Sequence, residues 1–580
     1  MSDSEAGALN SLERAASFAR AEAGQFDLVV IGAGITGAGV AHDAALRGLR
    51  VALVEAHDVA SGTSSRSSKM IHGGLRYLAH GDVGLVREAA RERQTLRRIA
   101  PHVARPAEFT MPCSTKMLAT MRAGLTAFER LGRVPRGERH RVLRPDELLR
   151  REPSLRVDRC SGGVVYTEFL TNDARLTLAN VRSAARAGTP GLTHAPVTEI
   201  IVERGRAVGV ECRSAVEGEQ LGARIRARAV VNAAGPWVDA IRRLEADHAP
   251  SRLTLTKGIH LVVPTERLGA RRTVLTLGAD RRPVFAVPVG DVTYLGTTDT
   301  FHPDAEVWPG IERPDVEYLL DAMAETFAGP RLEPSDVVAM WAGIRPLVAA
   351  EGKSPSEISR RDEVWLGPAG VRSIAGGKLT AYRTMAARVV DAIVEDLGAP
   401  RPGCSTDTVT LVGGDLDVEA SVEELARTLG PGEARRLVEL YGTDARSIAA
   451  AGGGMAAEVR HAVTREGALR LEDVWVRRSG RAWFSPEPVG ADLEVAATEM
   501  ARLLGWRPER QAAEVETCRR IHREAMSCLG DGGGDGGEPR AERAPTRRPP
   551  VLLAGARQGS SPPPTAVTSL DPKPRVLRQR

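Results

Sequence analysis

The sequence predicts an α/β protein with three parts: a domain built on a parallel βαβ unit, a mixed-sheet domain interleaved with it, and an all-α C-terminal domain. The first observation is an apolar run at 26–31 that leads directly into a glycine turn and a helix of small residues. The second is a series of short β-rich runs separated by turns between residues 160 and 299. The third is the loss of strand patterns beyond residue 410, where long amphipathic patterns replace them.

The βαβ unit is legible residue by residue. The run 26–31 (FDLVVI) is continuously apolar, as expected of a parallel strand covered on both faces. Small residues at 37–47 predict a helix, and Gly48 ends it. Residues 51–54 then predict a second strand, which stops at Glu55.

The later elements follow from the same patterns. Residues 58–77 are rich in glycine and serine and predict a loop, and 82–99 predicts a charged helix. Long amphipathic patterns predict helices at 456–478 and 493–525. The predicted boundaries are 1–25 for an N-terminal extension, 26–405 for the two interleaved domains, 406–528 for the helical domain and 529–580 for a disordered tail.

Composition excludes several classes of protein. With 42% hydrophobic and 26% charged residues in 580, the chain is neither disordered throughout nor a fibrous rod. Its net charge of +5 suggests nucleic acid or anionic lipid as a partner until the charge is located. Nine basic and five acidic residues lie in 531–580, so the rest is almost neutral. That basic segment has no aromatic residue to stack on bases, which argues against nucleic-acid binding.

Cysteine usage and hydropathy bear on the compartment. The six cysteines are scattered, form no CxxC pair and have no metal-ligand spacing, so reduced thiols and no metal site are expected. There is no secretory pattern and no apolar run of about 18 residues. We therefore expect a cytoplasmic protein whose membrane contact, at the inner face of the cell membrane, is peripheral.

A dinucleotide fingerprint stands between the first strand and the first helix. Gly32 permits a tight turn, Gly34 lets a pyrophosphate approach the backbone, and Gly37 packs the helix on the strand. The helix N-terminus supplies amide donors to phosphate. Glu55, at the end of the second strand, is placed to accept hydrogen bonds from ribose hydroxyls.

The fingerprint alone fits either a nicotinamide or a flavin. A second segment, SSRSSKMIHGGLRYL at 64–78, favours the flavin, because hydroxyls and paired glycines suit close approach to a large planar cofactor. The residues selected there are Ser64, Ser65, Ser68, Gly73 and Gly74.

The sequence resembles a known family, the FAD-dependent glycerol-3-phosphate dehydrogenases of the respiratory chain. The resemblance rests on GAGITGAGVAHDAALRG, SSRSSKMIHGGLRYL, VNAAGPWVD, TKGIHLVVP, LGTTDT, GIRPL and AGGKLTAYR, in family order, and extends from about residue 26 to 528. It implies an FAD domain of the glutathione-reductase-like, Rossmann-like type, a mixed-sheet substrate domain and a helical C-terminal cap. It also implies oxidation of sn-glycerol 3-phosphate to dihydroxyacetone phosphate, with the electrons passed through FAD to a membrane quinone.

The substrate phosphate needs cations in fixed positions, and charge-assisted hydrogen bonds to it are worth roughly 1.5–3 kcal/mol each. Arg345 in GIRPL is the first choice, with a catalytic role as well. The other residues that the resemblance assigns to the substrate are Arg76, Tyr77, Lys257, Arg360 and Lys378.

Hydride removal from C2 is easier when the hydroxyl loses its proton, so a general base is expected. His260 in TKGIHLVVP is the leading candidate, because its unperturbed pKa of about 6.5 suits a base near neutrality. Lys257 is close enough in sequence to favour the neutral imidazole. His72 in IHGG is the alternative.

Two further glycine turns are assigned to the cofactor. One contains Gly235 in NAAGPW, where backbone packing is the expected contact. The other combines glycines with a cation that would stabilise a reduced flavin, and comprises Gly376, Gly377, Lys378, Leu379 and Thr380. By contrast, Asp299, Glu472 and Asp473 lack partners at ligand spacing and are interpreted as turn, cap or surface residues.

Other functions stay open. An oxidase of the same fold, which releases peroxide, is the nearest alternative, and an amine or amino-acid oxidase is more distant. A flavin-binding regulator without turnover belongs to another class, and the substrate strings disfavour it. The expected partners are glycerol 3-phosphate and a quinone, with peripheral membrane contact and a homodimer left open.

Overall fold

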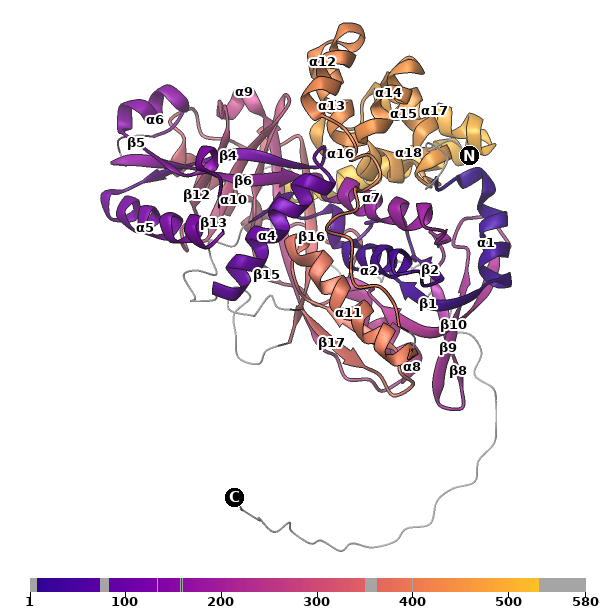
Figure 1. Ribbon diagram of the computed structural model, residues 1–580. Coiled ribbons are helices and arrows are strands. Elements are labelled where there is room, and N and C mark those ends of the chain that lie inside the picture. The colour runs from indigo at the N-terminus through magenta and orange to yellow at the C-terminus, as the bar shows by residue number, and fades with distance from the viewer. Residues whose placement is uncertain are drawn as a thin grey trace, which may run out of the picture. The chain divides into compact units, whose positions relative to one another are not determined.

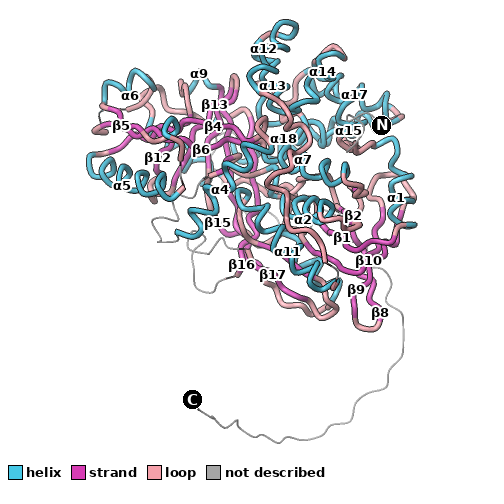
Figure 2. Tube along the Cα trace, in the orientation of Figure 1, coloured by secondary structure: helices cyan, strands magenta, loops and turns pink. Residues whose placement is uncertain are grey.

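Two sheets and a group of C-terminal helices form the structure (Figure 1). The computed structural model describes residues 8–72, 83–132, 134–156, 158, 160–349, 362–398 and 400–530. The predicted tail, 529–580, lies outside the described residues apart from its first two. Figure 2 shows the strands gathered in two regions, with helices against both.

The first sheet contains the βαβ unit. Its described strands are β17 (Glu363–Leu366), β18 (Arg372–Ala375), β10 (Gly222–Asn232), β1 (Gln25–Ile31), β2 (Val51–Val54) and β7 (Gly191–Leu192), in that order, with β9 (Arg206–Arg213) and β8 (Val197–Glu203) continuing from β10. Pairing is parallel from β18 through β10, β1 and β2 to β7, and antiparallel at β17, β9 and β8.

Strand β1 explains why this sheet is covered on both faces. Leu28 and Val30 pack with the helices of one face, and Val29 and Ile31 pack with the other. The first face carries α2 (Ile35–Leu46), α7 (Asp173–Arg186) and α11 (Tyr382–Leu397), and the other carries α1 (Arg14–Ala23) and α8 (Val238–Glu245). An apolar strand without alternation therefore marks a two-sided core, as predicted from the sequence.

The second sheet is mainly antiparallel. Its described strands run β15 (Thr300–Phe301), β11 (Leu253–Pro264), β14 (Val292–Gly296), β13 (Pro283–Val289), β12 (Thr273–Leu277), β4 (Ala104–Cys113), β6 (Gly162–Thr171) and β3 (Met70–Ile71), with β16 (Ala339–Val348) beside β11 and β5 (Arg141–Leu143) beside β6. The helices of this region are α4 (Val83–Ile99), α5 (Thr115–Leu131), α6 (Pro145–Arg151), α9 (Thr265–Leu268) and α10 (Arg313–Thr326).

Strand β11 separates two cores. Ile259, Leu261 and Val263 pack toward α10, whereas Val262 on the opposite face joins a core with the C-terminal helices. His260 shares the face of Val262, because side chains alternate along a strand. The candidate base therefore points toward the side where the three parts of the protein meet.

Only helices follow β18 in the described residues up to Leu529. After α11, the longer helices are α12 (Val418–Leu429), α13 (Pro431–Tyr441), α14 (Ala445–Ala450), α15 (Gly454–Arg465), a π-helix (Asp473–Arg478), α16 (Arg481–Phe484), α17 (Ala491–Leu504) and α18 (Pro508–Met526). The fold class predicted from the sequence is confirmed.

The two long helices predicted in this domain are wrong in length. The pattern 456–478 divides into α15 and the π-helix, and 493–525 divides into α17 and α18. Gly505 adopts a φ of +66° and Pro508 follows at the start of α18, which is the usual way a helix ends and another begins. Amphipathic periodicity persists across such a break because both helices pack on one core.

The described part of the segment before β1 contacts the C-terminal domain. Leu9 N–H donates to the Arg465 carbonyl oxygen at 3.0 Å, and Ser11 Oγ donates to the Ala468 carbonyl oxygen at 2.8 Å. The beginning of the described chain is thus fastened to the C-terminal domain. Within the described ranges, no helix combines the length and the hydropathy needed to cross a bilayer.

Candidate functional site

The fingerprint turn has the geometry that a bound dinucleotide requires. Gly32 adopts a φ of +102°, which glycine reaches without strain. A Cβ on Gly37 would lie 1.9 Å from the Gly32 carbonyl oxygen, so α2 can approach β1 only through glycine. Glu55 Oε2 accepts from Ala33 N–H at 2.6 Å and Oε1 accepts from His57 N–H at 2.9 Å. The acid is thus fixed beside the turn.

Glu55 also lies at a cavity. Burial raises the pKa of its carboxyl group, and the neighbouring Asp58 adds to that effect. A cavity of about 950 Å³ is lined by Ala33, Glu55 and Val59, and by Ser11 and Arg14 from the segment before β1. Of the predicted site residues that the structure describes, His260, Arg345 and Lys378 are not among its lining residues. This cavity therefore belongs to the fingerprint end of the molecule and not to the reaction centre.

The serine-rich loop meets the fingerprint. Ser64 Oγ accepts from Ile35 N–H at 2.9 Å, at the start of α2. A Cβ on Gly34 would meet only that hydroxyl, at 3.2 Å, so no other protein atom among the described residues covers the backbone on this side. Ser65 is buried in the same short turn. The two segments selected from the sequence thus form one cradle, and these residues fit FAD.

The other predicted glycine turns come to the same region. Gly235 has a φ of +55°, with no atom near an added Cβ. Gly376 and Gly377 have φ values of +82° and +80°. Thr380 Oγ1 contacts the His72 carbonyl oxygen at 3.4 Å, which joins this turn to the end of the serine-rich loop. The alternative base, His72, is therefore beside the flavin turn.

Lys378 and Leu379 occupy the start of the helix that follows this turn. Both are half-buried, and Lys378 stands at the N-cap of the short helix Leu379–Ala381. A cation at this position is near the place where the sequence expects the edge of a flavin ring. It stays a predicted contact.

His260 is buried on the central face of β11. Its ring stacks on Trp341 with centroids 4.7 Å apart and an interplanar angle of 13°. Nε2 is 2.9 Å from Ser68 Oγ, so the serine-rich loop reaches the base. Burial, Arg345 and Lys69 hold the pKa of His260 well below its usual range. The imidazole is therefore neutral, as a base must be.

Arg345 lies on the same face, one strand away on β16. Its Nη1 donates to Asp299 Oδ1 at 2.9 Å, and Nη2 donates to the Thr298 carbonyl oxygen at 3.0 Å. A Cβ on Gly258 would fall 2.0 Å from Nη2, so the guanidinium lies directly over that glycine. The cation and the imidazole are neighbours because residues 256, 258 and 260 share a face with 341, 343 and 345.

Three glycines leave this face of the sheet without side chains at their positions. Gly258 pairs with Gly343 across β11 and β16, and Gly296 pairs with His260 across β11 and β14. A Cβ on Gly296 would lie 2.1 Å from the His260 ring, and one on Gly343 would lie 2.5 Å from the Arg66 carbonyl oxygen. The serine-rich loop, the base and Arg345 all approach the sheet through these gaps.

Lys257 lies on the opposite face of β11. Its Nζ donates to the Gly310 carbonyl oxygen at 2.9 Å and lies 3.4 Å from Asp315, at the start of α10. Since adjacent strand residues point to opposite faces, the structure does not bring Lys257 together with His260 or Arg345. The cations that lower the pKa of His260 are Arg345 and Lys69, which corrects the role expected of Lys257.

Five predicted site residues fall outside the described residues. They are Gly73, Gly74, Arg76, Tyr77 and Arg360. Their assignments stay predictions.

Sequence reasoning missed three groups that surround the base. Asp299 holds Arg345, Trp341 stacks on His260, and Lys69 contributes the second cation. The lysine carried a sequence signal, since lysine is rare in this arginine-rich chain, and Asp299 lies within the motif LGTTDT. Asp299 lies in the turn between β14 and β15, as predicted, but the surface interpretation is wrong, because its side chain is 8% exposed and ion-paired.

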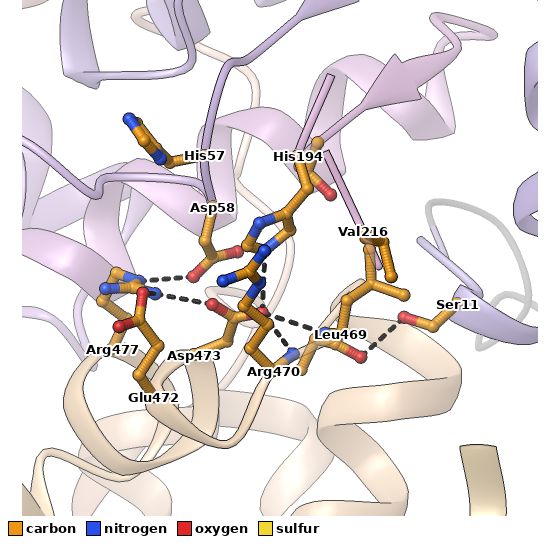
Figure 3. Close-up of polar contacts among 12 residues, drawn as sticks. Ser11, His57, Asp58, His194, Val216, Leu469, Arg470, Glu472, Asp473 and Arg477 are labelled. Carbon is orange, nitrogen blue, oxygen red and sulfur yellow. Dashed lines mark hydrogen bonds and ion pairs between the residues drawn. The ribbon is translucent and has the colours of Figure 1, made fainter. Parts of the chain in front are cut away.

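A buried ionic cluster ties the C-terminal domain to the loop after β2 (Figure 3). Asp58 accepts from Arg477 Nε at 2.5 Å and from Arg478 Nη2 at 2.8 Å. Asp473 accepts from Arg477 Nη2 at 2.6 Å, and its other oxygen is 3.1 Å from His194 Nε2. The surface interpretation is therefore wrong for Asp473, whose side chain is fully buried against Arg477, whereas Glu472 is half-buried and stands at the N-cap of the π-helix.

The cluster has the residue types of a metal site but not its electrostatics. Ligand atoms of Asp58, His194 and Asp473 lie within 4.8 Å of one another. The two guanidinium groups already neutralise the carboxylates, and Leu469 N–H donates to Asp473 Oδ2 at 2.9 Å. A divalent cation would have to displace those donors.

Asp58→Asn is expected to lower the free energy of unfolding by about 3 kcal/mol or more, because it leaves two buried guanidinium groups without their shared carboxylate. Urea unfolding followed by fluorescence measures the change. Asp321→Asn is the matched control, since it removes an exposed partner of Arg331 and is expected to leave the midpoint unchanged. A midpoint for Asp58→Asn that equals the control's would contradict the prediction.

The cradle and the domain plan define an FAD-dependent oxidoreductase. A family described as FAD dependent oxidoreductase matches residues 27–383, and the C-terminal domain of alpha-glycerophosphate oxidase matches 404–511. The chain is 36% identical over 533 residues to an aerobic glycerol-3-phosphate dehydrogenase of Staphylococcus haemolyticus, across 87% of this chain and 95% of that protein. A Staphylococcus aureus relative of the same name is 36% identical over 531 residues, with 87% and 95% covered.

A solved structure agrees with these relatives. The glycerol-3-phosphate dehydrogenase from Bacillus halodurans, complexed with FAD, superimposes with a TM-score of 0.76 at 32% identity, over 90% of this chain and 99% of that chain. This chain belongs to the FAD-dependent glycerol-3-phosphate dehydrogenase family. The family and the cofactor predicted from the sequence are confirmed.

Proposed function

We propose that this protein oxidises sn-glycerol 3-phosphate at C2 to dihydroxyacetone phosphate and passes the electrons through FAD to a quinone. The observation that carries the proposal is the placing of a neutral, buried His260 beside Arg345 on a glycine-cleared face, in contact with the serine-rich loop of the FAD cradle. The curated relatives are named aerobic glycerol-3-phosphate dehydrogenases, which supports the substrate and the oxidation but does not name the acceptor.

Each residue has a distinct role in the proposed reaction. Arg345, fixed by Asp299, supplies a planar cation for the substrate phosphate. His260 accepts the C2 hydroxyl proton on a ring nitrogen as the carbonyl forms. When bound, FAD supplies the acceptor for the C2 hydride. Lys378, at the flavin turn, adds a second cation for the phosphate or the reduced ring.

The proposal is tested by anaerobic absorbance of the purified holoenzyme before and after glycerol 3-phosphate is added. Loss of the oxidised-flavin bands would establish hydride donation by this substrate. Flavin that stays oxidised would sink the substrate assignment and leave the fold untouched.

Arg345→Met is expected to raise the substrate concentration for half-maximal flavin reduction by about 10- to 100-fold, because it removes charge-assisted hydrogen bonds to phosphate. Stopped-flow reduction over a range of substrate concentrations measures it. Arg267→Met, which breaks an arginine–carboxylate pair with Asp336 away from the base, is the control and should match the unaltered protein. Equal concentration dependence in both variants would remove Arg345 from the phosphate site.

The acceptor is tested separately. Peroxide measured under air, with and without a soluble quinone, distinguishes the dehydrogenase from an oxidase. Peroxide release at the rate of substrate oxidation, unaffected by quinone, would favour the oxidase.

Peripheral attachment to the membrane is part of the proposal, and flotation with vesicles tests it. Protein that never floats, whatever the lipid, would overturn that part.

A further inference from the structure

A buried lysine, Lys69, lies close to the predicted base His260 and has no role in the reaction proposed above. Lys69 is 5% exposed and adopts a φ of +55°, which a non-glycine residue keeps only when its surroundings hold it there. Its Nζ donates to Asp173 Oδ1 and to the Ser65 carbonyl oxygen, each at 2.7 Å. A buried ion pair of this kind carries a large desolvation cost, so its position calls for an explanation.

Three aromatic rings surround the ammonium group and are called the lysine cage. The Nζ atom is 5.4 Å from the ring centroid of Trp341, 4.9 Å from that of Trp483 and 5.8 Å from that of Phe484. These distances are within the range of cation–π attraction. Trp341 belongs to β16, but the other two rings belong to α16. The C-terminal domain therefore completes the cage.

The cage and the base share their supports. Trp341 stacks on the His260 ring, and Trp483 packs on Trp341 with centroids 5.0 Å apart. Asp173, which holds the lysine, also accepts from Ser67 N–H at 2.9 Å and from Ser67 Oγ at 2.7 Å. The next residue of that loop is the serine whose hydroxyl contacts the base.

The charges that face His260 can be named. Among the described residues they are Arg345 on β16 and Lys69 on the serine-rich loop, with Asp173 behind the lysine. Tyr294 on β14 is the remaining titratable neighbour, and burial raises the pKa of its phenol, so it is uncharged. The buried imidazole thus faces two cations.

We propose that Lys69 is a positioning residue for the reaction: with Asp173 it fixes the loop that presses Ser68 against His260. Its ammonium group also adds a positive charge that, after burial and Arg345, disfavours protonation of that imidazole. The proposal rests on the proposed function, because it takes His260 as the base. It also gives the C-terminal domain a part in the reaction centre, since α16 closes the lysine cage.

The direct test is a pH titration of His260 by NMR in holoenzyme that carries ¹³C-labelled histidine. His260→Asn identifies the signal among the 12 histidines. The pKa of His260 should be well below its ordinary value in the unaltered protein, higher in Lys69→Met and low again in Lys69→Arg, which keeps the charge. A His260 signal that titrates alike in the unaltered protein and in Lys69→Met would overturn the proposal.

Lys257→Met is the matched control. Lys257 is a second buried, ion-paired lysine, three residues from His260 on the same strand but on the opposite face. Its removal should leave the His260 titration where it is. If Lys69→Met does not fold, Lys69→Gln replaces it, because the amide keeps a donor for Asp173 without the charge. Protonation of His260 in its ordinary pH range in the unaltered holoenzyme would by itself overturn the proposal.

Kinetics give the second readout. Anaerobic flavin reduction in Lys69→Met should be slower by about 10- to 100-fold at neutral pH, as expected when a base is misplaced, and Lys69→Arg should recover part of that loss. A rate equal to that of the unaltered protein would contradict the positioning role. Should glycerol 3-phosphate not reduce the unaltered protein at all, the proposed function fails, while the NMR titration still decides what Lys69 does to His260.

Discussion

His260→Asn is expected to slow flavin reduction by glycerol 3-phosphate by a factor of about 10² to 10⁴ while FAD stays bound, since the variant removes the group that takes the hydroxyl proton. Nε2 contacts Ser68, and the buried Nδ1 has no hydrogen-bond partner among the described residues, so no protein group that the structure describes occupies that nitrogen. Asparagine cannot accept that proton with a comparable pKa. Stopped-flow absorbance of the anaerobic holoenzyme measures the rate.

The direction in which the flavin reduction rate changes with pH is a second test of the base. The folded protein holds the pKa of His260 below its usual value, so the neutral base persists as pH falls through about 6.5. The reduction rate of the unaltered protein should therefore stay level through that range and decline only at lower pH. A rate that falls with the ordinary titration of histidine would mean that another group is the base.

The control for this variant is a buried histidine elsewhere. His102 is 3% exposed, and burial together with Arg175 lowers its pKa to about 3. His102→Asn removes an equally buried imidazole outside the site and should leave the reduction rate unchanged. If His260→Asn loses less than about tenfold relative to this control, the base has to be sought at His72.

Gly37→Ala is expected to abolish stoichiometric FAD binding and to destabilise the fold. The added methyl would lie 1.9 Å from the Gly32 carbonyl oxygen, a backbone atom that cannot rotate away. Helix α2 would have to shift from β1, and overpacking of this kind typically costs about 1–3 kcal/mol. The absorbance ratio of flavin to protein and urea unfolding measure the two effects.

Substitutions at two other glycines distinguish an effect on cofactor binding from an effect on folding. Gly34→Ala would meet only Ser64 Oγ, at 3.2 Å, so the apoprotein should fold while the methyl blocks the pyrophosphate. Gly124, inside α5, has nothing within 4 Å of an added Cβ. Gly124→Ala should bind FAD fully and gain up to about 1 kcal/mol of helix stability. Full flavin content in Gly37→Ala would contradict the packing argument.

The C-terminal domain contacts both the fingerprint region and the surroundings of the predicted base. Its π-helix supplies Arg477 and Arg478 to Asp58, three residues after the acid of the fingerprint, and α16 supplies two rings of the lysine cage. The domain was expected from the sequence as a helical cap without a defined role. Its contacts explain why the segment REGALRLEDVWVRRSG carries charged residues in an otherwise buried helix.

The candidate site was predictable where chemistry depends on local backbone. Glycines that permit a turn, a hydroxyl-rich loop and an acid at a strand end are all visible in short stretches, and they form one cradle in the structure. Lys257 shows the limit of such reasoning. Three residues of separation in sequence suggested proximity to His260, but the twofold alternation of a strand puts the two side chains on opposite faces.

The sequence by itself determined the secondary structure of the first βαβ unit, the FAD fingerprint and the family, because these depend on backbone freedom and hydrophobic periodicity within short segments. Only the tertiary structure decided which charges meet. Lys69 and Asp173 are 104 residues apart, Arg345 and Asp299 are 46 apart, and Asp58 and Arg478 are 420 apart. Periodicity tells that a side chain is buried, but the partner that makes a buried charge tolerable comes from the way the sheets and the C-terminal helices pack.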